Sequence, residues 1–258
     1  MIPRYIFFGG RESAFAQIIL DSLIAAGMPP VEAVRDAKKP LDLDHLRSLN
    51  ADFFVVAAFG KILKKDLLII PPRGTIGIHP SLLPRYRGAS PVQSVLLHDE
   101  NETGTALFLI DEKVDNGPVL AEKKLAITDQ DTYVSLIEKL ARLSADLLIA
   151  TMPAWLDDSL TAVPQDESKA TFTRKFVTAD AEVDLAGDPR SAWLKIRALN
   201  PEPGAFTVLH LKNGKDLRLK LLEADLADGR LDLKKVQPEG KKPMTYADFM
   251  NGYRDLIG

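Results

Sequence analysis

Apolar positions in the N-terminal part of the chain fall into short continuous runs and helically spaced sets. Tyr5 to Phe8 form a short apolar run that ends at Gly9-Gly10, and apolar residues then recur at helical spacing from Ser13 to Ala26. A short apolar run bounded by turn residues is typical of a buried strand, whereas the helical period predicts an amphipathic helix. The segment therefore predicts a strand, a tight turn and a helix.

The same alternation continues through most of the chain. Further strands are predicted at residues 53–58, 75–78, 105–110 and 119–127, and helices at residues 92–97 and 132–149. Pro91 is well placed for the first turn of the shorter helix, because proline lacks the N–H that a first turn leaves unpaired. Apolar strands that alternate with helices predict a parallel sheet, so we expect an α/β fold with a Rossmann-like sheet.

The pattern changes after residue 156. Residues 157–169 are polar and lack an apolar period, which is typical of a connector between domains. Beyond a predicted helix at residues 191–198, short alternating runs broken by Asn-Gly and Asp-Gly turns predict β-hairpins. We therefore predict three parts, which are an α/β domain at 1–156, a linker at 157–175 and a small β-rich domain at 176–258.

Composition excludes several classes of protein and site. The chain has 258 residues, of which 46% are hydrophobic, so it can bury a substantial core. The apolar run at Tyr5 to Phe8 is too short for a secretory signal or a membrane span, so we expect a cytoplasmic protein without a membrane partner. Zero cysteines exclude disulfides and thiolate ligands, and the four histidines do not cluster, so we expect no metal site.

Charge is unevenly distributed along the chain. Residues 1–168 carry 17 Lys and Arg against 23 Asp and Glu (net −6), whereas residues 169–258 carry 16 against 13 (net +3). The C-terminal part is thus the better candidate for contact with phosphate. A difference of this size is equally compatible with an ordinary solvated surface.

One histidine stands at the end of a predicted strand. His79 follows the apolar run 75–78 and precedes a loop with two prolines, Pro80 and Pro84. Ligands of open α/β sheets bind at the carboxyl ends of parallel strands, and fixed backbone on either side of a loop holds a side chain at a set depth. The position favours a catalytic histidine, although a lone histidine near an apolar segment is more often structural.

The loop that follows His79 resembles that of the folate-dependent formyltransferases. The family motif N-x-H-x-S-L-L-P-x-x-x-G matches here from His79 through Gly88. The family also places an aspartate in a glycine-containing loop further along the chain, and Asp115, 36 residues after His79, matches it. Taken alone, Asp115-Asn116-Gly117 is ordinary turn chemistry. With both motifs present, the resemblance implies that His79 and Asp115 are catalytic.

The resemblance implies a mechanism and a donor site. His79 is expected to stabilise the oxyanion and protonate the leaving nitrogen, and Asp115 to take up the proton of the attacking amine, with the one-carbon unit between the two side chains. The implied donor is 10-formyltetrahydrofolate. The residues implied to bind it are Ser81, Leu82, Leu83, Pro84, Gly88, Asn116 and Gly117.

Later segments are similar to one branch of this family, the methionyl-tRNA formyltransferases. The matching stretches are residues 173–175, 196–201 and 237–244, the last of which reads Q-P-E-G-K-K-P-M. This similarity implies formyl transfer to the amine of initiator methionyl-tRNA, in support of translation initiation, by a formyltransferase domain followed by a reduced OB-like domain. Initiator methionyl-tRNA and folate are the expected partners, and we expect a monomer.

Two departures from the family pattern concern function. Gly77 stands where the family has asparagine two residues before the histidine, so the side-chain amide expected to hold the formyl oxygen is absent. The long basic loop that reaches the tRNA acceptor end in the family is also missing, since only residues 28–52 fill that interval. Lys38-Lys39 is its expected remnant. The second domain is shortened between residues 222 and 236.

Some assignments stay open at this level. Arg85 and Arg87 contact either the folate tail or the acceptor stem, or they are solvated loop arginines, and Lys241-Lys242 carries the same ambiguity. The departures favour two alternative functions. One is a formyltransferase for an amino sugar nucleotide or another small amine, and the other is a folate-binding protein with impaired catalysis.

Overall fold

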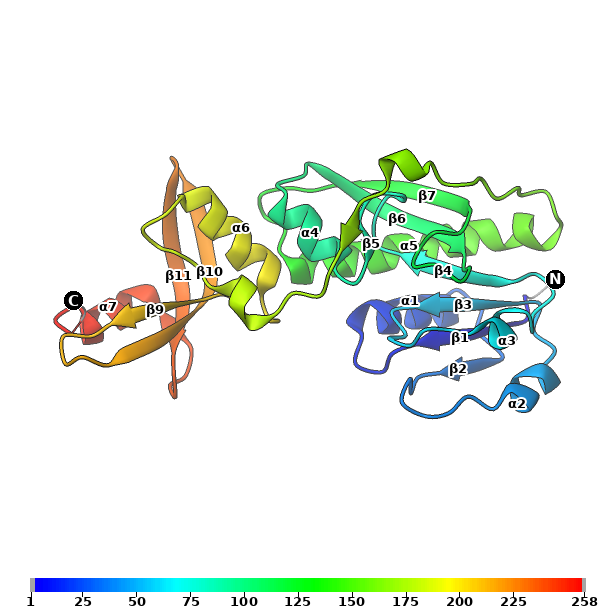
Figure 1. Ribbon diagram of the computed structural model, residues 1–258, viewed down its shortest axis with the longest axis horizontal. Helices are drawn as coiled ribbons and strands as arrows, with labels where there is room; N and C mark the ends of the chain where they lie inside the picture. Colours follow the sequence, from blue (N-terminus) through cyan, green and yellow to red (C-terminus); the bar gives the residue numbers. More distant parts are fainter. Residues whose placement is uncertain (1–2, 257–258) are drawn as a thin grey trace. The chain divides into compact units, whose positions relative to one another are not determined.

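A mixed six-stranded sheet organises the N-terminal part of the structure, a computed structural model that describes residues 3–256 (Figure 1). The elements up to residue 173 are β1 (Tyr5–Gly9), α1 (Ala14–Ala25), β2 (Glu32–Val34), α2 (Leu43–Ser48), β3 (Phe53–Ala57), α3 (Lys65–Leu68), β4 (Thr75–His79), β5 (Arg87–Gly88), α4 (Pro91–Leu97), β6 (Glu102–Leu109), β7 (Val119–Ala126), α5 (Tyr133–Leu156), the 3-10 helix η1 (Glu167–Lys169) and β8 (Phe172–Thr173).

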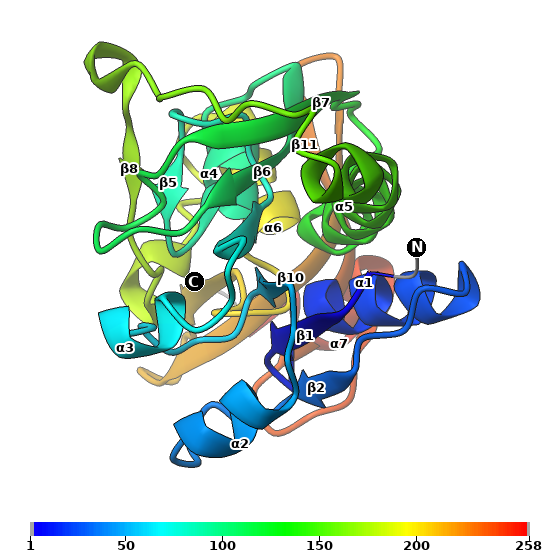
Figure 2. The same cartoon turned by 90° about the vertical axis from the view of Figure 1, so that its right-hand side faces the viewer.

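The sheet has the strand order β2-β1-β3-β4-β6-β7. The first four strands in this order are mutually parallel, and β6 and β7 run antiparallel to their neighbours. Helices α1 and α5 lie on one face and α2 and α3 on the other, as Figures 1 and 2 show together. The predicted α/β fold with a parallel-dominated sheet is therefore confirmed.

Both faces of the central strands are buried, which explains their continuous apolar sequences. Ile6, Phe8 and Phe54 pack with Leu46 of α2 and Leu67 of α3 in one buried cluster. The intervening residues of β1 and β3 point to the opposite face, because side chains alternate along a strand, and they are equally buried. The sheet is thus a rigid frame for the ends of its strands.

The chain divides into two compact units near residue 173. The first unit contains residues 1–91, 101–128 and 135–173, and the second contains 92–100, 129–134 and 174–258. Elements of the second unit from residue 174 onwards are the 3-10 helix η2 (Thr178–Ala181), α6 (Pro189–Leu199), β9 (Phe206–His210), β10 (Asp216–Ala227), β11 (Arg230–Pro238), β12 (Met244–Thr245) and α7 (Tyr246–Tyr253).

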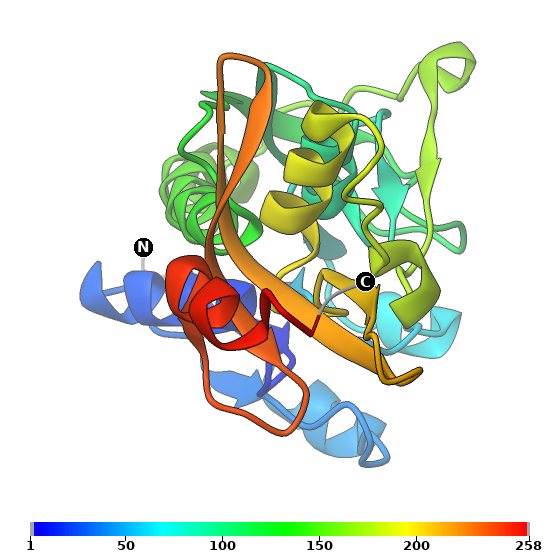
Figure 3. The same cartoon turned by 90° about the vertical axis from the view of Figure 1, so that its left-hand side faces the viewer.

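The second unit is built on a four-stranded antiparallel sheet. Its strand order is β12-β11-β10-β9. Ile196 of α6 and Phe249 of α7 join Leu219, Leu221 and Val236 of the sheet in one buried cluster. Figure 3 faces this unit and shows α6 in yellow and α7 in red beside the orange strands. The predicted small β-rich domain is present.

The structure contains elements that the sequence pattern did not predict. Strand β2 and helix α2 lie in the interval 28–52, where few residues are buried and the apolar period is weak. Asp42 caps α2 by accepting hydrogen bonds from the backbone N–H groups of Asp44 and His45. Helix α5 continues past its predicted end, through Pro153, to Leu156. By contrast, the hairpin predicted at the Asp-Gly turn is confirmed, since strands β10 and β11 pair on either side of Asp228 and Gly229.

Phe249 offers a test of the core of the second unit, because its side chain is fully buried there. We expect Phe249→Ala to lower the free energy of unfolding by about 3–5 kcal/mol through the cavity it leaves. The chain has two tryptophans, so urea unfolding followed by Trp193 fluorescence in a Trp155→Phe background reports on this unit. The control is Val177→Ala at an exposed position, expected within about 0.5 kcal/mol. Equal effects of the two substitutions would refute the assignment of this core.

Candidate active site

His79 is the last residue of β4 and lies at the carboxyl ends of the parallel strands. Its side chain is 6% exposed. Its backbone carbonyl accepts a hydrogen bond from Thr105 Oγ1 of β6 at 3.2 Å, and that hydroxyl also bonds Ser144 Oγ of α5 at 2.7 Å. The backbone of His79 is therefore fixed by β6 directly and, through the Thr105 hydroxyl, by α5.

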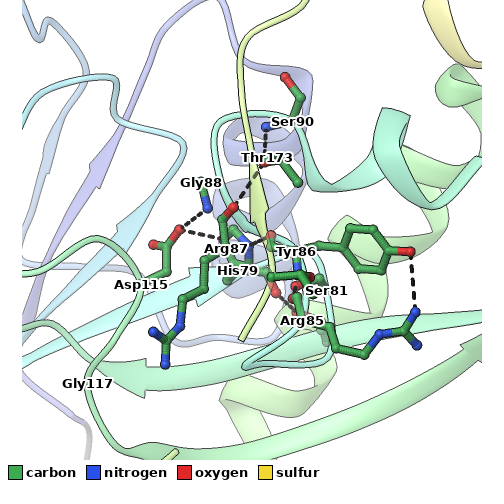
Figure 4. Close-up of polar contacts among 12 residues, drawn as sticks. His79, Ser81, Arg85, Tyr86, Arg87, Gly88, Ser90, Asp115, Gly117 and Thr173 are labelled. Atoms are coloured by element: carbon green, nitrogen blue, oxygen red, sulfur yellow. Dashed lines mark hydrogen bonds and ion pairs between the residues drawn. The ribbon is translucent and has the colours of Figure 1, made fainter. Parts of the chain in front are cut away.

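The imidazole ring of His79 is held between two oxygens (Figure 4). Nε2 lies 2.8 Å from the backbone carbonyl of Tyr86, and Nδ1 lies 3.5 Å from Asp115 Oδ2. A carbonyl only accepts, so Nε2 must carry a proton and donate it to Tyr86. Nδ1 is then the nitrogen left for chemistry. It faces the carboxylate of Asp115, an arrangement in which a proton can pass between the two groups.

Asp115 lies in the turn between β6 and β7 and adopts a φ of +49°. Its Oδ2 accepts a hydrogen bond of 2.8 Å from the backbone N–H of Gly88, so a single carboxylate oxygen contacts both the amide and the histidine. Figure 4 shows the carboxylate between Gly88 and the ring of His79. This arrangement fixes which oxygen faces Nδ1.

The expectation that a one-carbon unit lies between His79 and Asp115 is wrong. His79 Nδ1 and Asp115 Oδ2 are 3.5 Å apart. A carbon atom that lies directly between them and contacts both needs a separation of about 7 Å. The space between these two atoms is therefore too small for a one-carbon unit. The close approach favours direct proton transfer between the two side chains.

The loop residues implied to bind the donor differ in exposure. Ser81 and Leu83 are buried, and the hydroxyl of Ser81 donates to the carbonyl of Arg85 at 2.7 Å. Leu83 packs against Ala106 and Phe108 in a small core cluster. Leu82 and Pro84 are partly exposed. The buried pair therefore shapes the loop, and the other two side chains remain partly exposed at its surface.

Gly88, Asn116 and Gly117 are held by contacts within the protein. A Cβ atom at Gly117 would lie 1.7 Å from the carbonyl oxygen of Leu109, so only glycine fits at that position. The amide of Asn116 accepts from Arg87 Nη1 at 3.1 Å and donates to Asp111 Oδ2 at 2.9 Å. The side chain of Asn116 is thus engaged at both ends, and it ties the turn to the loop.

Neither interpretation of Arg87 was correct, because its side chain is only 1% exposed. The guanidinium donates to Asn116 Oδ1, to Gln165 Oε1 and to both carboxylate oxygens of Glu167. The hydrogen bond from Arg87 holds the pKa of the Glu167 carboxyl below its ordinary value. Arg87 is a structural centre of the site. Arg85 is exposed, and its guanidinium lies over the ring of Tyr86.

The site also depends on residues of the predicted linker. The two-residue strand β5 pairs in parallel with β8, where Arg87 N–H donates to the carbonyl of Thr171 and Thr173 Oγ1 donates to the carbonyl of Arg87. Gln165 donates to two carbonyls of the Asp115 turn. The sequence pattern did not predict a role for these residues. The one signal was the presence of Thr and Gln in a segment that is otherwise typical of a connector.

Gly77 is closely covered by Phe108, its direct partner across β4 and β6. A Cβ atom at Gly77 would lie 2.5 Å from Phe108 Cε1, 2.6 Å from Cζ and 3.0 Å from Ile110 Cγ1. Real Cβ atoms do not approach carbon this closely, so the aromatic ring occupies the space that a side chain at residue 77 would need. In this chain, a side chain at residue 77 requires the Phe108 ring to move.

The described residues 3–256 contain neither a candidate metal site nor a candidate membrane span. This part of the chain has no group of three or more His, Asp or Glu side chains placed to hold a metal ion. Across the same residues, every helix is too short or too polar to cross a lipid bilayer.

Comparison with known proteins gives consistent matches in sequence. The formyl transferase family model matches residues 13–152. A methionyl-tRNA formyltransferase of Dictyoglomus turgidum is 36% identical over 262 residues, covering 93% of this chain and 83% of the relative.

Solved structures show the same fold at low sequence identity. Methionyl-tRNA formyltransferase from Clostridium thermocellum gives a TM-score of 0.68 at 18% identity, covering 91% of this chain and 98% of that one. HypX from Aquifex aeolicus, solved in complex with tetrahydrofolic acid, gives a TM-score of 0.77 at 15% identity. The match covers 98% of this chain, which spans about half of HypX, 48% of its length.

The contact between Gly77 and Phe108 generates a stability prediction. We expect Gly77→Asn to lower the free energy of unfolding by about 1–3 kcal/mol, because the new side chain overpacks against the ring. Phe108→Ala alone should also destabilise the protein, by leaving a cavity. In the double variant the asparagine enters that cavity, so the two effects should fall short of additivity by about 1 kcal/mol or more, measured by urea unfolding. Strictly additive effects would show that the ring does not exclude a side chain at residue 77.

Proposed function

This chain belongs to the formyl transferase family, and from that premise we propose that it transfers the formyl group of 10-formyltetrahydrofolate to the amine of initiator methionyl-tRNA. The observation that carries the proposal is the contact between His79 Nδ1 and Asp115 Oδ2 at the carboxyl end of β4. The two motifs that identify the family in sequence thus meet in space.

In the proposed reaction the two side chains move protons and the co-substrate supplies the formyl group. Asp115 Oδ2 takes the proton that the attacking amine loses, and protonated His79 Nδ1 gives one to the leaving nitrogen of the donor. Charge that develops on the formyl oxygen is stabilised by the same Nδ1–H. A proton that passes from Oδ2 to Nδ1 across 3.5 Å then restores the starting state. No covalent bond to the enzyme is required.

The proposed donor site lies along the loop that follows β4. Leu82 and Pro84 offer partly exposed apolar surface beside the catalytic pair, which suits a flat heterocycle such as that of folate. The internal contacts described above shape this site, and the residues that make them are Ser81, Leu83, Gly88, Asn116 and Gly117. Their proposed role is to hold the loop and the turn at the spacing that the donor needs.

The proposed acceptor is initiator methionyl-tRNA, as in the relative from D. turgidum. Residues 169–258 carry a net charge of +3, and Lys241 and Lys242 among them are exposed in the turn between β11 and β12. Basic side chains on an exposed turn suit contact with tRNA phosphates. A monomer in the cytoplasm, where tRNA is charged, completes the proposal.

Replacement of the catalytic pair tests the proposal directly. We expect His79→Ala and Asp115→Asn to lower kcat about 10²- to 10⁴-fold, the usual contribution of general acid–base groups, with circular dichroism unchanged. Formylation of methionyl-tRNA by formyl folate is the assay. The matched control is His210→Ala, which breaks an exposed His–Asp pair in the second unit and should keep wild-type turnover. Near-wild-type turnover in His79→Ala would refute the catalytic assignment.

An amino sugar nucleotide is the competing acceptor, because Gly77 replaces the family's asparagine and residues 28–52 are too short for the long basic loop. The two acceptors are separated by running both with the wild-type enzyme. We expect product with methionyl-tRNA and none with the sugar. The reverse result would move the enzyme to the small-amine branch, and donor binding without either product would make it a folate-binding protein.

Binding of tRNA should depend steeply on salt. If Lys241 and Lys242 each contact a phosphate, the slope of log affinity against log salt should become shallower by about 1–2 in Lys241→Gln/Lys242→Gln. Filter binding between low and physiological salt gives this slope. The kcat at saturating tRNA should stay unchanged, since neither lysine lies in the proposed catalytic pair. An unchanged slope would remove these residues from the acceptor site.

A further inference from the structure

One glutamine holds the turn that carries Asp115. Gln165 Nε2 donates to the carbonyl of Asp115 at 2.9 Å and to the carbonyl of Gly117 at 2.7 Å. A single amide nitrogen therefore bonds two carbonyls of the same turn, one on each side of Asn116. Since Asp115 has a φ of +49°, in the left-handed region that non-glycine residues rarely adopt, this turn needs such external support.

The orientation of the Gln165 amide is itself fixed by Arg87. Gln165 Oε1 accepts from Arg87 Nη2 at 2.7 Å and from Nε at 3.1 Å. A guanidinium only donates, so the oxygen of the amide must face Arg87 and its nitrogen must face the turn. Arg87 also donates to Asn116 Oδ1, in the middle of the turn. Two side chains thus hold three consecutive residues.

The segment that carries Gln165 is anchored on both sides of it. Val163 exchanges two backbone hydrogen bonds of 2.8 Å with Val119, the first residue of β7. On the other side, β8 pairs with β5, and the N–H of Tyr86 donates to Thr171 Oγ1 at 2.8 Å. The backbone on both sides of Gln165 is therefore fixed, and the segment holds the Gln165 side chain against the turn.

We propose that Gln165 is a positioning residue that sets the carboxylate of Asp115 against His79, with Arg87 fixing the orientation of its amide. The inference rests on the proposed function, since it gives Gln165 a part in that reaction. Under this proposal, Asp115 Oδ2 keeps its contacts with His79 Nδ1 and with the N–H of Gly88 only while Gln165 holds the two carbonyls of the turn.

Kinetics of two substitutions at Gln165 provide the first test. Gln165→Glu keeps the size and an oxygen for Arg87 but removes both N–H donors, and Gln165→Leu removes all polar contacts. Both should lower kcat about 10- to 100-fold, as small misplacements of reacting groups do, while KM for formyl folate and for methionyl-tRNA changes by less than about threefold. Unchanged kcat in both variants would overturn the proposal.

A matched control separates positioning from loss of stability. Leu148→Val removes one methylene group from the buried face of α5, away from the turn, and should lower the unfolding midpoint without lowering kcat at the assay temperature. Loss of kcat in Leu148→Val equal to that in the Gln165 variants would mean that general destabilisation explains both, and would overturn the positioning role.

The exchange rate of the Gly88 amide hydrogen tests the proposal without substrates, because Asp115 Oδ2 accepts its hydrogen bond. In Gln165→Leu this amide should exchange about tenfold faster or more, approaching the rate in Asp115→Ala, and in Leu148→Val it should keep the wild-type rate. A wild-type rate in Gln165→Leu would overturn the proposal. If the wild-type enzyme fails to formylate methionyl-tRNA, the proposed function falls, and the Gly88 amide still decides the role of Gln165.

Discussion

The hydrogen bond from His79 Nε2 to the carbonyl of Tyr86 is the constraint on which the rest of the site depends. It commits one nitrogen of the ring and leaves the other to face Asp115. The same short strand supplies the Gly88 N–H that holds the carboxylate. Because the carbonyl of residue 86 and the N–H of residue 88 point to the same edge of β5, two residues of backbone orient both members of the pair.

The opposite edge of β5 explains why the predicted linker belongs to the chemistry. The N–H and carbonyl of Arg87 point away from the pair and bond Thr171 and Thr173. An edge strand of two residues has no stability of its own, so it keeps its position only because β8 pairs with it. The Arg87 side chain extends the same support to Gln165 and the Asp115 turn. The site is thus assembled from three segments that are distant in sequence.

The sequence was most informative where one periodicity or one motif determines the outcome. Apolar runs predicted β1, β3 and β4 because those strands are buried on both faces, and the loop motif brought His79 and Asp115 together as candidates. Arg87 was not predictable, because its neighbour Arg85 has the same side chain in the same loop and is exposed. The guanidinium of Arg87 is engaged by acceptors that lie 29 to 80 residues later, at Asn116, Gln165 and Glu167. Polar residues that pair with a distant backbone leave no periodic signal.

Gly77 shows how a departure in sequence acquires a physical meaning in the structure. A glycine in place of asparagine leaves no side-chain amide at this position, and the ring of Phe108 occupies the space where such a side chain would begin. The nearby Gly88 N–H is already engaged with Asp115. In the proposed reaction, stabilisation of the developing oxyanion therefore rests on His79 Nδ1–H. Since one such donor contributes about 3–4 kcal/mol to catalysis, the proposed reaction depends more heavily on His79 and Asp115 than it would with an amide at residue 77.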